Sequence, residues 1–462
     1  MSDRVSSTIS TSPSALAVGG RKSGRFMIVG QTQTGDVTKA AIVRSLAEYV
    51  AVYGARSAGS SMYDAAELGF RCGVSELVVA RAAGPNPVKA TVSLSAGNIV
   101  VTAKDAGAYA NTYTAAYATA GTTLTLVAGS ATETYSGATA AALVAAAASS
   151  TRFTVTSNGT LPAGNVTSTA LAGGTDDFAN VVWATSLGLL TPDLGAGAVS
   201  IPGLPYATVG QAIATHCSTN KRHGLVTAAA GTAVAALVTA VATIKAYTSS
   251  EYLDLVGPWV KVSDGAGGTK TVDPTPFAAG LRAAAIRVSP GESAAAEVYA
   301  RPVVDVTPEY QVNSTDWATL NAARISTIRT VGAYTRLYTY VMTAAPGGNL
   351  NLIGGQYRDL INDITVSAEE ILESETNSPA SPGHLAQIVG RLSAMLSPYS
   401  GTYLGIRTAG DGSLVDPGYR VQCSTGTALA DNRITATISL RLGESIDFVD
   451  LVVAVGDATV SL

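Results

Sequence analysis

The sequence predicts a mixed α/β protein of several domains, in which an antiparallel β domain is inserted into an α/β core and an extended arm flanks each end. Three observations support this prediction. Strand-like apolar runs alternate with helical periodicity before residue 84. Charged residues then become rare up to residue 174, where Thr, Ala, Gly and Val alternate, and the α/β pattern returns after residue 176. A chain of 462 residues is long enough for about three domains.

These changes of pattern set the expected domain boundaries. The turn-rich stretch GPNP, at residues 84–87, marks the start of the insertion. We expect an N-terminal linking arm over residues 1–22, an α/β domain built from residues 23–87 and 176–300, an inserted β domain over residues 88–175, a second α/β domain over residues 301–443, and a C-terminal linking strand over residues 444–462.

The first α/β segment begins with FMIVG at residues 26–30, which predicts a buried strand, and ends with SELVVARA at residues 75–82, which predicts another. Residues 37–54 carry apolar side chains at near-helical spacing, and Tyr63–Gly73 predicts a helix closed by glycine. After the insertion, two further segments predict helices and a third predicts a strand and loop: VGQAIATHCSTN, TAVAALVTAVATIKAY and YLDLVGPWVKVSD.

The last third of the chain continues the mixed pattern. Paired strands are predicted for NAARISTIRTVGAYTRLYTYVM, and helices for GGQYRDLINDITVSAEEILES and PGHLAQIVGRLSAML. A final strand, RITATISLRL, alternates cleanly and is followed after Gly443 by the apolar strand DFVDLVVAV. One face of the alternating strand carries Ile434, Ala436, Ile438, Leu440 and Leu442.

The composition favours a protein that covers its surface with copies of itself. Hydrophobic residues make up 47% and charged residues only 13%, against about 25% charged residues in an average soluble protein. The net charge of −4 gives no reason to expect nucleic acid as a partner. No apolar run is long enough to span a membrane, and the N-terminus lacks the apolar core of a signal peptide. Three sparse cysteines suggest reduced thiols and assembly in a cytoplasm.

One motif suggests nucleotide binding, and its chemistry argues against it. Gly30 and Gly35 end an apolar strand with the spacing of a phosphate-binding loop, which needs Lys and then Ser or Thr after the second glycine. Here Asp36 and Val37 follow, and a carboxylate would repel phosphate. Lys39 comes three residues too late. We therefore expect a structural turn.

Other candidate sites are equally weak. His216, His223 and His384 lack the spacing of a zinc site. The carboxylates of SAEEILESE are expected on a solvated helix face, and the glycine-rich SDGAGGTK is expected as a hairpin turn. We therefore predict no catalytic, cofactor-binding or metal-binding residues, and no enzymatic activity.

The order of motifs resembles that of contractile tail sheath proteins of bacteriophages and related injection machines. The resemblance spans Arg25 to Val455. Asp177 departs from the family pattern, which has glycine after the GG-x-D turn, and the usual tryptophan before the last long helix is missing. The segments that carry the resemblance are RFMIVG, ELVVARA, VVTAKDAGAYAN, LAGGTDD, GPWVKVSDGAGGTKTVDPTPFAAGLRAAA, IRTVGAYTRLYTY and QYRDLINDI.

The resemblance implies a structural subunit that polymerises around an inner tail tube protein as stacked hexameric rings and contracts without consuming nucleotide. Baseplate and terminator proteins would be further partners, the location would be the virion tail after assembly in the host bacterial cytoplasm, and the inserted β domain would face outwards. A late helix would line the lumen. We expect this helix at Leu385–Leu396, with Arg391 as its contact to the tube.

Both ends of the chain are expected to exchange strands between subunits, as the family's arms do. Val5 and Ile9 alternate with polar residues as a donated strand would, and the C-terminal strand is apolar on both faces. The edge of RITATISLRL is a natural acceptor. The residues expected at the exchange are Val5, Ile9, Ile434, Ile438, Leu440, Leu451, Val453 and Val455.

Two alternatives remain open at this stage. A nucleotide- or sugar-modifying α/β enzyme with a β insertion would explain the glycine loop, but Asp36 and the missing catalytic residues count against it. A viral coat protein or surface adhesin built on β domains would explain the insertion, but the α/β segments count against that.

Overall fold

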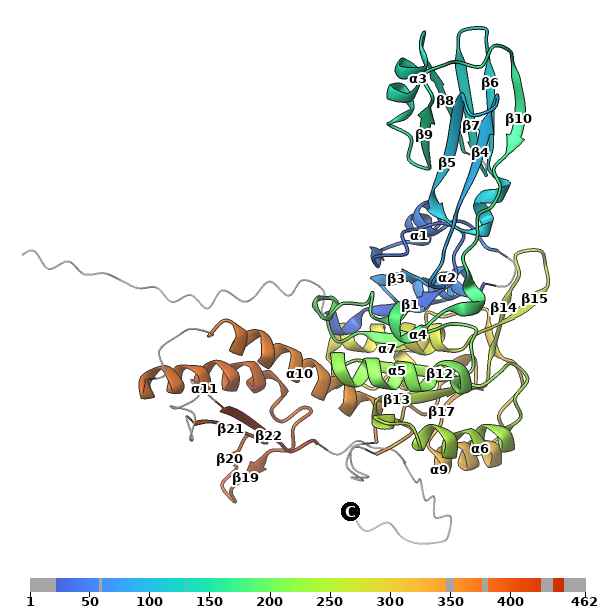
Figure 1. Cartoon of the computed structure of the whole chain (residues 1–462). Coiled ribbons are helices and arrows are strands. Elements are labelled where there is room, and N and C mark those ends of the chain that lie inside the picture. Colours follow the sequence, from blue (N-terminus) through green and yellow to red (C-terminus); the bar gives the residue numbers. More distant parts are fainter. Residues whose placement is uncertain are drawn as a thin grey trace, which may run out of the picture. The chain divides into compact units, whose positions relative to one another are not determined.

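The computed structural model describes residues 22–57, 60–129, 131–345, 353–375, 381–424 and 435–443. The chain divides into two compact units, Met1–Asp363 and Ile364–Leu462 (Figure 1). Both linking arms lie outside the described residues, apart from Lys22 at the end of the first. The mixed α/β fold with an inserted antiparallel β domain is confirmed.

The first unit is built on an eight-stranded sheet. Its order is β18 (Tyr334–Leu337), β17 (Ser326–Val331), β13 (Leu253–Gly257), β12 (His223–Thr227), β11 (Ala198–Ser200), β1 (Phe26–Gly30), β3 (Leu77–Arg81) and β2 (Ala41–Val43). The inner strands run parallel, and the edge strands β2 and β18 are antiparallel to their neighbours. Every residue of β1, β3, β12 and β13 is buried, as expected for parallel strands covered on both faces.

Helices cover both faces of this sheet. Phe26 and Ile28 of β1 point into a core with α1 (Leu46–Tyr53), α2 (Met62–Cys72) and α7 (Thr275–Val288). Met27 and Val29 point into the opposite core, which contains α4 (Trp183–Leu187), α5 (Tyr206–Asn220), α6 (Val234–Lys245) and α9 (Ser314–Ala323). A small sheet of β15 (Thr269–Val272), β14 (Val260–Ser263) and β16 (Val306–Pro308), and the short helix α8 (Glu297–Ala300), complete the core.

The helix expected over residues 37–54 is shorter than its apolar spacing suggests. Residues Ala41–Val43 form the edge strand β2, and α1 begins only at Leu46. Ser45 caps this helix, because its hydroxyl accepts a hydrogen bond of 3.1 Å from the Glu48 amide. The β-branched pair Ile42 and Val43 pairs with β3 instead of joining the helix.

The insertion consists of two antiparallel sheets with a core of their own (Figure 1). One sheet contains β4 (Lys89–Leu94), β5 (Ile99–Ala106) and β9 (Phe153–Ser157), and the other contains β10 (Val166–Ala170), β6 (Thr114–Ala118), β7 (Thr123–Ala128) and β8 (Ala131–Ser136). Alternate residues of β4 are buried. The helix α3 (Ala140–Ala147), which the sequence analysis did not predict, packs Leu143 into this core.

The domain boundary expected at residue 301 is wrong. Strand β17 extends the large sheet by pairing with β13, and Ile328 and Leu337 lie in the same core as Phe26. The division between the units falls instead at Asp363, within the helix α10 (Gly355–Glu373). Paired strands were correctly expected here, but their periodicity does not reveal which sheet they join.

The second unit is smaller and less deeply buried. Helix α11 (Pro382–Leu396) packs Ile388 and Leu392 against β21 (Tyr419–Ser424) and β22 (Thr435–Leu440), which form a two-stranded antiparallel sheet. A second small sheet contains β19 (Arg407–Thr408) and β20 (Leu414–Asp416). Within the described ranges, none of the helices has both the length and the apolar character needed to cross a membrane.

Candidate functional sites

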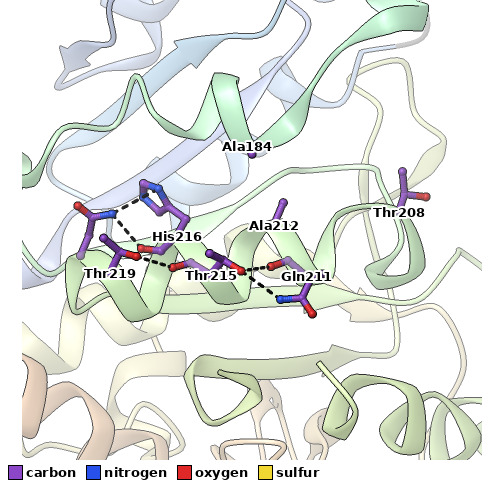
Figure 2. Close-up of a pocket in the computed structure, with 8 residues that line it drawn as sticks. Ala184, Thr208, Gln211, Ala212, Thr215, His216 and Thr219 are labelled. Atoms are coloured by element: carbon purple, nitrogen blue, oxygen red, sulfur yellow. Dashed lines mark hydrogen bonds between the residues drawn. The ribbon is translucent and has the colours of Figure 1, made fainter. Parts of the chain in front are cut away.

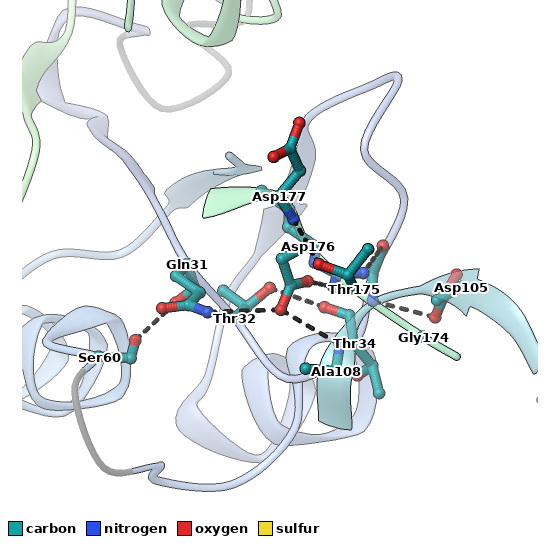
Figure 3. A network of polar contacts seen from close by, with 12 residues as sticks. Gln31, Thr32, Thr34, Ser60, Asp105, Ala108, Gly174, Thr175, Asp176 and Asp177 are labelled. Atoms are coloured by element: carbon teal, nitrogen blue, oxygen red, sulfur yellow. Dashed lines mark hydrogen bonds and ion pairs between the residues drawn. The ribbon is translucent and has the colours of Figure 1, made fainter. Parts of the chain in front are cut away.

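The loop between Gly30 and Gly35 is occupied by side chains of the protein itself (Figure 3). The Gly35 amide donates a hydrogen bond of 3.0 Å to the Oδ2 atom of Asp105, which lies on β5 of the insertion. The Gly35 carbonyl accepts one of 2.9 Å from Arg81. An amide that could hold an anionic ligand is therefore already paired with a carboxylate of the same chain, which agrees with the expectation of a structural turn.

Arg81 and Asp176 form a buried ion pair at the base of the insertion. The Arg81 guanidinium is fully buried and donates to the Asp176 carboxylate. The other carboxylate oxygen of Asp176 accepts bonds of 3.4 Å from the Gln31 side chain and from the Ala108 amide. We call this cluster the junction (Gln31, Gly35, Arg81, Asp105, Ala108 and Asp176). It links the core loop to the base of the insertion, where the chain enters and leaves this domain.

Asp36 and Asp177 border the junction, and each stabilises a local turn. Asp36 accepts hydrogen bonds from the hydroxyl and the amide of Thr38, and these bonds lower the pKa of its carboxyl. Asp177 has a left-handed backbone with φ of 51°. Glycine, which the family has at this position, is the residue that this backbone conformation favours. Aspartate is among the few other residues that tolerate it.

A second polar cluster lies wholly inside the first unit. Asp359, near the start of α10, accepts a 2.9 Å bond from Arg282 and lies 3.0 Å from the Nδ1 atom of His223. Burial by itself would raise the pKa of Asp359, but Arg282 and His223 outweigh it and lower the pKa to about 2. All three side chains are buried. The cluster anchors α10 to the sheet. Because solvent does not reach these side chains, the cluster offers no access to a substrate.

A surface hollow runs along α5 and is lined mainly by threonine, alanine and amide side chains (Figure 2). The Thr215 and Thr219 hydroxyls donate to the carbonyls of Gln211 and Thr215, each at 3.0 Å, so the helix itself uses these donors. The other lining residues are Ala184, Thr208, Ala212, His216 and Asn220. Among these described lining residues, no nucleophile is arranged beside a base.

His216, at the floor of this hollow, accompanies a buried arginine. Arg222 donates to the carbonyls of Leu190, Thr191 and Gly195 at 2.6–2.8 Å, and its Nη1 lies 2.7 Å from the Nε2 atom of His216. Burial and the positive charge of Arg222 lower the pKa of His216 to about 4. The imidazole is therefore neutral near pH 7 and accepts a hydrogen bond from the arginine. The pair fixes the loop before β11.

The three histidines belong to three different elements. His216 is on α5, His223 is on β12, and His384 lies in the second unit at the start of α11. Among the described residues, no group of three or more His, Cys, Asp or Glu side chains is arranged to hold a metal ion.

Arg391, the expected contact to the tube, has a partner within the chain. Its guanidinium forms an ion pair with Glu375, whose other carboxylate oxygen lies 3.1 Å from the Nε2 atom of His384. The Arg391 side chain is still 49% exposed. Arg391 is therefore already paired within its own chain, although half of its side-chain surface remains available for another contact.

The described part of the strand-exchange region is the sheet of β21 and β22. Ile438 pairs with Val421 and packs towards α11, and Leu440 pairs with Tyr419. Within the described residues, each of these strands has a hydrogen-bonded neighbour on one side only. The remaining residues expected at the exchange lie outside the described ranges: Val5, Ile9, Ile434, Leu451, Val453 and Val455.

Sequence reasoning missed the junction. Asp105 and Asp176 are 70 and 141 positions away from Gly35, and only their charge within an almost uncharged segment could have drawn attention to them. A buried carboxylate requires a partner, but the sequence does not say which backbone amide or arginine supplies it.

Comparison with solved structures identifies the fold. The chain matches a sheath tail protein of Listeria innocua with a TM-score of 0.62 and 14% identity, over 92% of each chain. It matches a sheath tail protein of Desulfitobacterium hafniense with a TM-score of 0.60 and 15% identity, over 87% of this chain and 90% of that one. It also matches the contracted helical sheath of the anti-feeding prophage with a TM-score of 0.54 and 11% identity, over 93% and 92%. No family model and no curated protein sequence matches the chain.

Proposed function

We propose that this chain, which has the fold of sheath tail proteins, is a structural subunit of a contractile tail sheath. The likeness over about nine-tenths of both chains carries the proposal, because it includes the core, the insertion and the second unit together. The low charge supports it, since a surface with few charges is suited to burial between copies. The subunits would polymerise as stacked hexameric rings around an inner tail tube protein and contract to drive that tube through a target cell envelope.

The candidate sites support a structural role over an enzymatic one. Asp105 already fills the loop that resembles a phosphate site, and the His223 cluster is buried. The α5 hollow uses its hydroxyl donors within the helix. These groups stabilise the fold of one subunit. Contraction would then be a downhill rearrangement of the lattice that consumes no nucleotide.

Subunits would be linked by their two ends. The sheet of β21 and β22 has open edges within the described residues, and six residues separate the end of β22 from the segment DFVDLVVAV. Each donated strand could form about five main-chain hydrogen bonds, at roughly 1 kcal/mol net apiece. Burial of its apolar side chains would add about 25 cal/mol per Å². Such a link would act as a hinge during contraction, while the rigid units repack.

The remaining placements complete the proposal. The insertion, residues 88–175, would face outwards, and α11 with Arg391 would face the tube. Baseplate and terminator proteins would close the two ends of the sheath. The assembled protein would be part of a virion tail after assembly in the host bacterial cytoplasm.

Electron microscopy of the purified chain, alone and co-expressed with its tube protein, tests this function. Hollow cylinders of uniform width are expected, and cylinders formed with the tube protein should enclose a tube. Closed shells would indicate a coat protein instead. Soluble monomers that stay monomeric with the tube protein would contradict a sheath role.

A further inference from the structure

The hairpin at the edge of the large sheet places two arginines opposite each other. Arg329 of β17 pairs in register with Arg336 of β18, which is the edge strand. Both guanidinium groups lie against the ring of Tyr338, at 5.1 and 4.8 Å from its centroid. Trp317 of α9 packs edge-on against the same ring at 5.1 Å. The aromatic pair therefore holds both cations at this edge, which we call the basic edge (Arg329, Arg336 and Tyr338).

The positive charge of the basic edge is poorly compensated. Arg336 lies 3.5 Å from Glu297, but this carboxylate also pairs with Arg301 at 3.1 Å. Arg329 donates to the Ser314 hydroxyl, and in the described part of the chain no carboxylate lies within ion-pair distance of it. The buried Nε atoms of Arg329 and Arg336 have no hydrogen-bond acceptor among the described residues. Like charges directly opposite each other destabilise a strand pair, and the one carboxylate nearby, which is shared with Arg301, does not balance both arginines.

The end of helix α10 shows the opposite imbalance. Glu369 and Glu373 are exposed, lie one helical turn apart, and form no ion pair with any described residue. Like charges at this spacing repel, and negative charge near a helix C-terminus is unfavourable. No basic residue lies in the last turn of α10 to offset them. We call these two residues the acidic turn.

We propose that the basic edge of one copy of this chain binds the acidic turn of a second copy. The two pairs are opposite in charge and similar in spacing, because Cβ atoms are about 4.5–5.5 Å apart for residues opposite each other in a hairpin and about 5–6 Å apart for residues one turn apart in a helix. Each arginine could thus meet one carboxylate. The contact would relieve two repulsive pairs at once, and it would cover Val298, which is 57% exposed on the short helix beside β18.

This contact deepens the proposed function, on which it rests, by naming one lattice interface. It involves no donated strand, so it joins the folded units directly. A rearrangement of the lattice could make or break it without unfolding either unit. Because the two carboxylates are exposed and the arginines are only partly buried, salt would weaken the contact within a few tenths of a molar.

Charge exchange between copies tests the proposal. One variant carries Arg329→Glu and Arg336→Glu, a second carries Glu369→Arg and Glu373→Arg, and a third carries all four changes. Pairwise association is measured by sedimentation velocity at low salt, which does not require cylinders. We expect each double variant alone to associate at least ten-fold more weakly than the wild-type chain. An equimolar mixture of the two, and the fourfold variant, should recover most of the loss.

The controls separate this contact from folding and from the sheath proposal. Arg329→Glu alone places opposite charges across the hairpin, so it should leave the melting temperature unchanged or higher while weakening association. Lys39→Glu, at a side chain that is 76% exposed, should change neither. Unchanged association of both double variants, or recovery in the fourfold variant but not in the mixture, would overturn the proposal. Cylinder formation by the wild-type chain is scored separately and tests the sheath function.

Discussion

The junction and the sheet of β21 and β22 satisfy their polar groups in opposite ways. At the junction, Gly35, Arg81 and Asp176 find their partners within one chain, although these residues are far apart in sequence. In the second unit, each strand of the two-stranded sheet has a free edge within the described residues. Buried polar groups without partners are costly, so the first arrangement indicates a finished structure and the second indicates a surface that another strand can complete.

The comparison separates the stability of a subunit from its assembly. Changes at the junction should lower the free energy of unfolding of the first unit and leave the edges of the second unit untouched. Changes at the ends of the chain should abolish assembly and leave folding unaltered. All three tryptophans, Trp183, Trp259 and Trp317, lie in the first unit, so their fluorescence reports the unfolding of that unit.

The largest effect is expected from removing the C-terminal strand. A chain that ends at Gly443 keeps all the hydrophobic cores described above but loses the strand proposed to complete a neighbour's sheet. We expect soluble subunits with an unchanged circular dichroism spectrum and no cylinders. A chain that ends at Gly456 keeps residues 447–455 and should assemble normally, which makes it the matched control. Normal cylinders from the shorter chain would refute strand exchange at this end.

Removing one member of the buried ion pair should have the next largest effect. Asp176→Ala leaves the Arg81 guanidinium buried without its carboxylate, and loss of one partner of such a pair costs about 3–5 kcal/mol. Adding Arg81→Met should restore much of this loss, because the unpaired charge is then gone. Urea unfolding followed by tryptophan fluorescence measures both variants. A loss below about 0.5 kcal/mol, as expected for the exposed control Lys39→Ala, would show that the pair does not stabilise the first unit.

A pH effect is expected at the floor of the α5 hollow. His216 has a pKa of about 4 in the fold, against 6.5 in its unperturbed state. The unfolded chain therefore binds a proton that the folded chain does not, and stability falls as pH decreases from 6.5 to 4. The slope from this group is about 1.4 kcal/mol per pH unit.

His216→Gln isolates this effect, because glutamine can still accept a hydrogen bond from Arg222. The variant should be less sensitive to pH than the wild-type chain between pH 6.5 and 4. His223 does not interfere with this measurement. Burial alone would lower its pKa, but Asp359 and Asp254 raise it, so its contribution to the free energy of unfolding changes only above pH 6.5. Parallel stability curves for the two proteins would show that His216 is not the titrating group.

The sequence predicted those parts of the fold that depend on local patterns. The fully buried strands β1 and β3 appear as uninterrupted apolar runs, and the insertion appears as alternation in a stretch with little charge. Periodicity could not assign β17 to the large sheet, because a strand carries no local signal of its neighbour. The strand β2 was missed because it has only three residues, fewer than one helical turn. So short a strand does not interrupt the helical spacing of the apolar residues around it.

The polar contacts around the candidate sites were harder to predict. The sequence predicted a structural turn at Gly30–Gly35, since Asp36 replaces the lysine of a phosphate loop. It could not identify Asp105 as the group that occupies the Gly35 amide, because that contact depends on how the insertion meets the core. It likewise could not identify Glu375 as the partner of Arg391, since Glu375 lies in the turn after α10, 16 positions away in sequence.

The smallest effect is expected at Asp177, where the chain leaves the insertion. Its left-handed backbone costs an ordinary residue about 1–2 kcal/mol, a cost that glycine avoids. Its carboxylate accepts bonds from the Asn86 amide at 3.1 Å and the Asn180 side chain at 2.7 Å.

Asp177→Ala loses these bonds and keeps the unfavourable backbone, whereas Asp177→Gly loses the bonds but relieves the backbone. We therefore expect the alanine variant to be less stable than the glycine variant by about 1 kcal/mol. Urea unfolding followed by tryptophan fluorescence can measure this difference, since Trp183 packs against Phe178 beside this turn. Equal stability of the two variants would mean that backbone conformation at this position does not limit the stability of the junction.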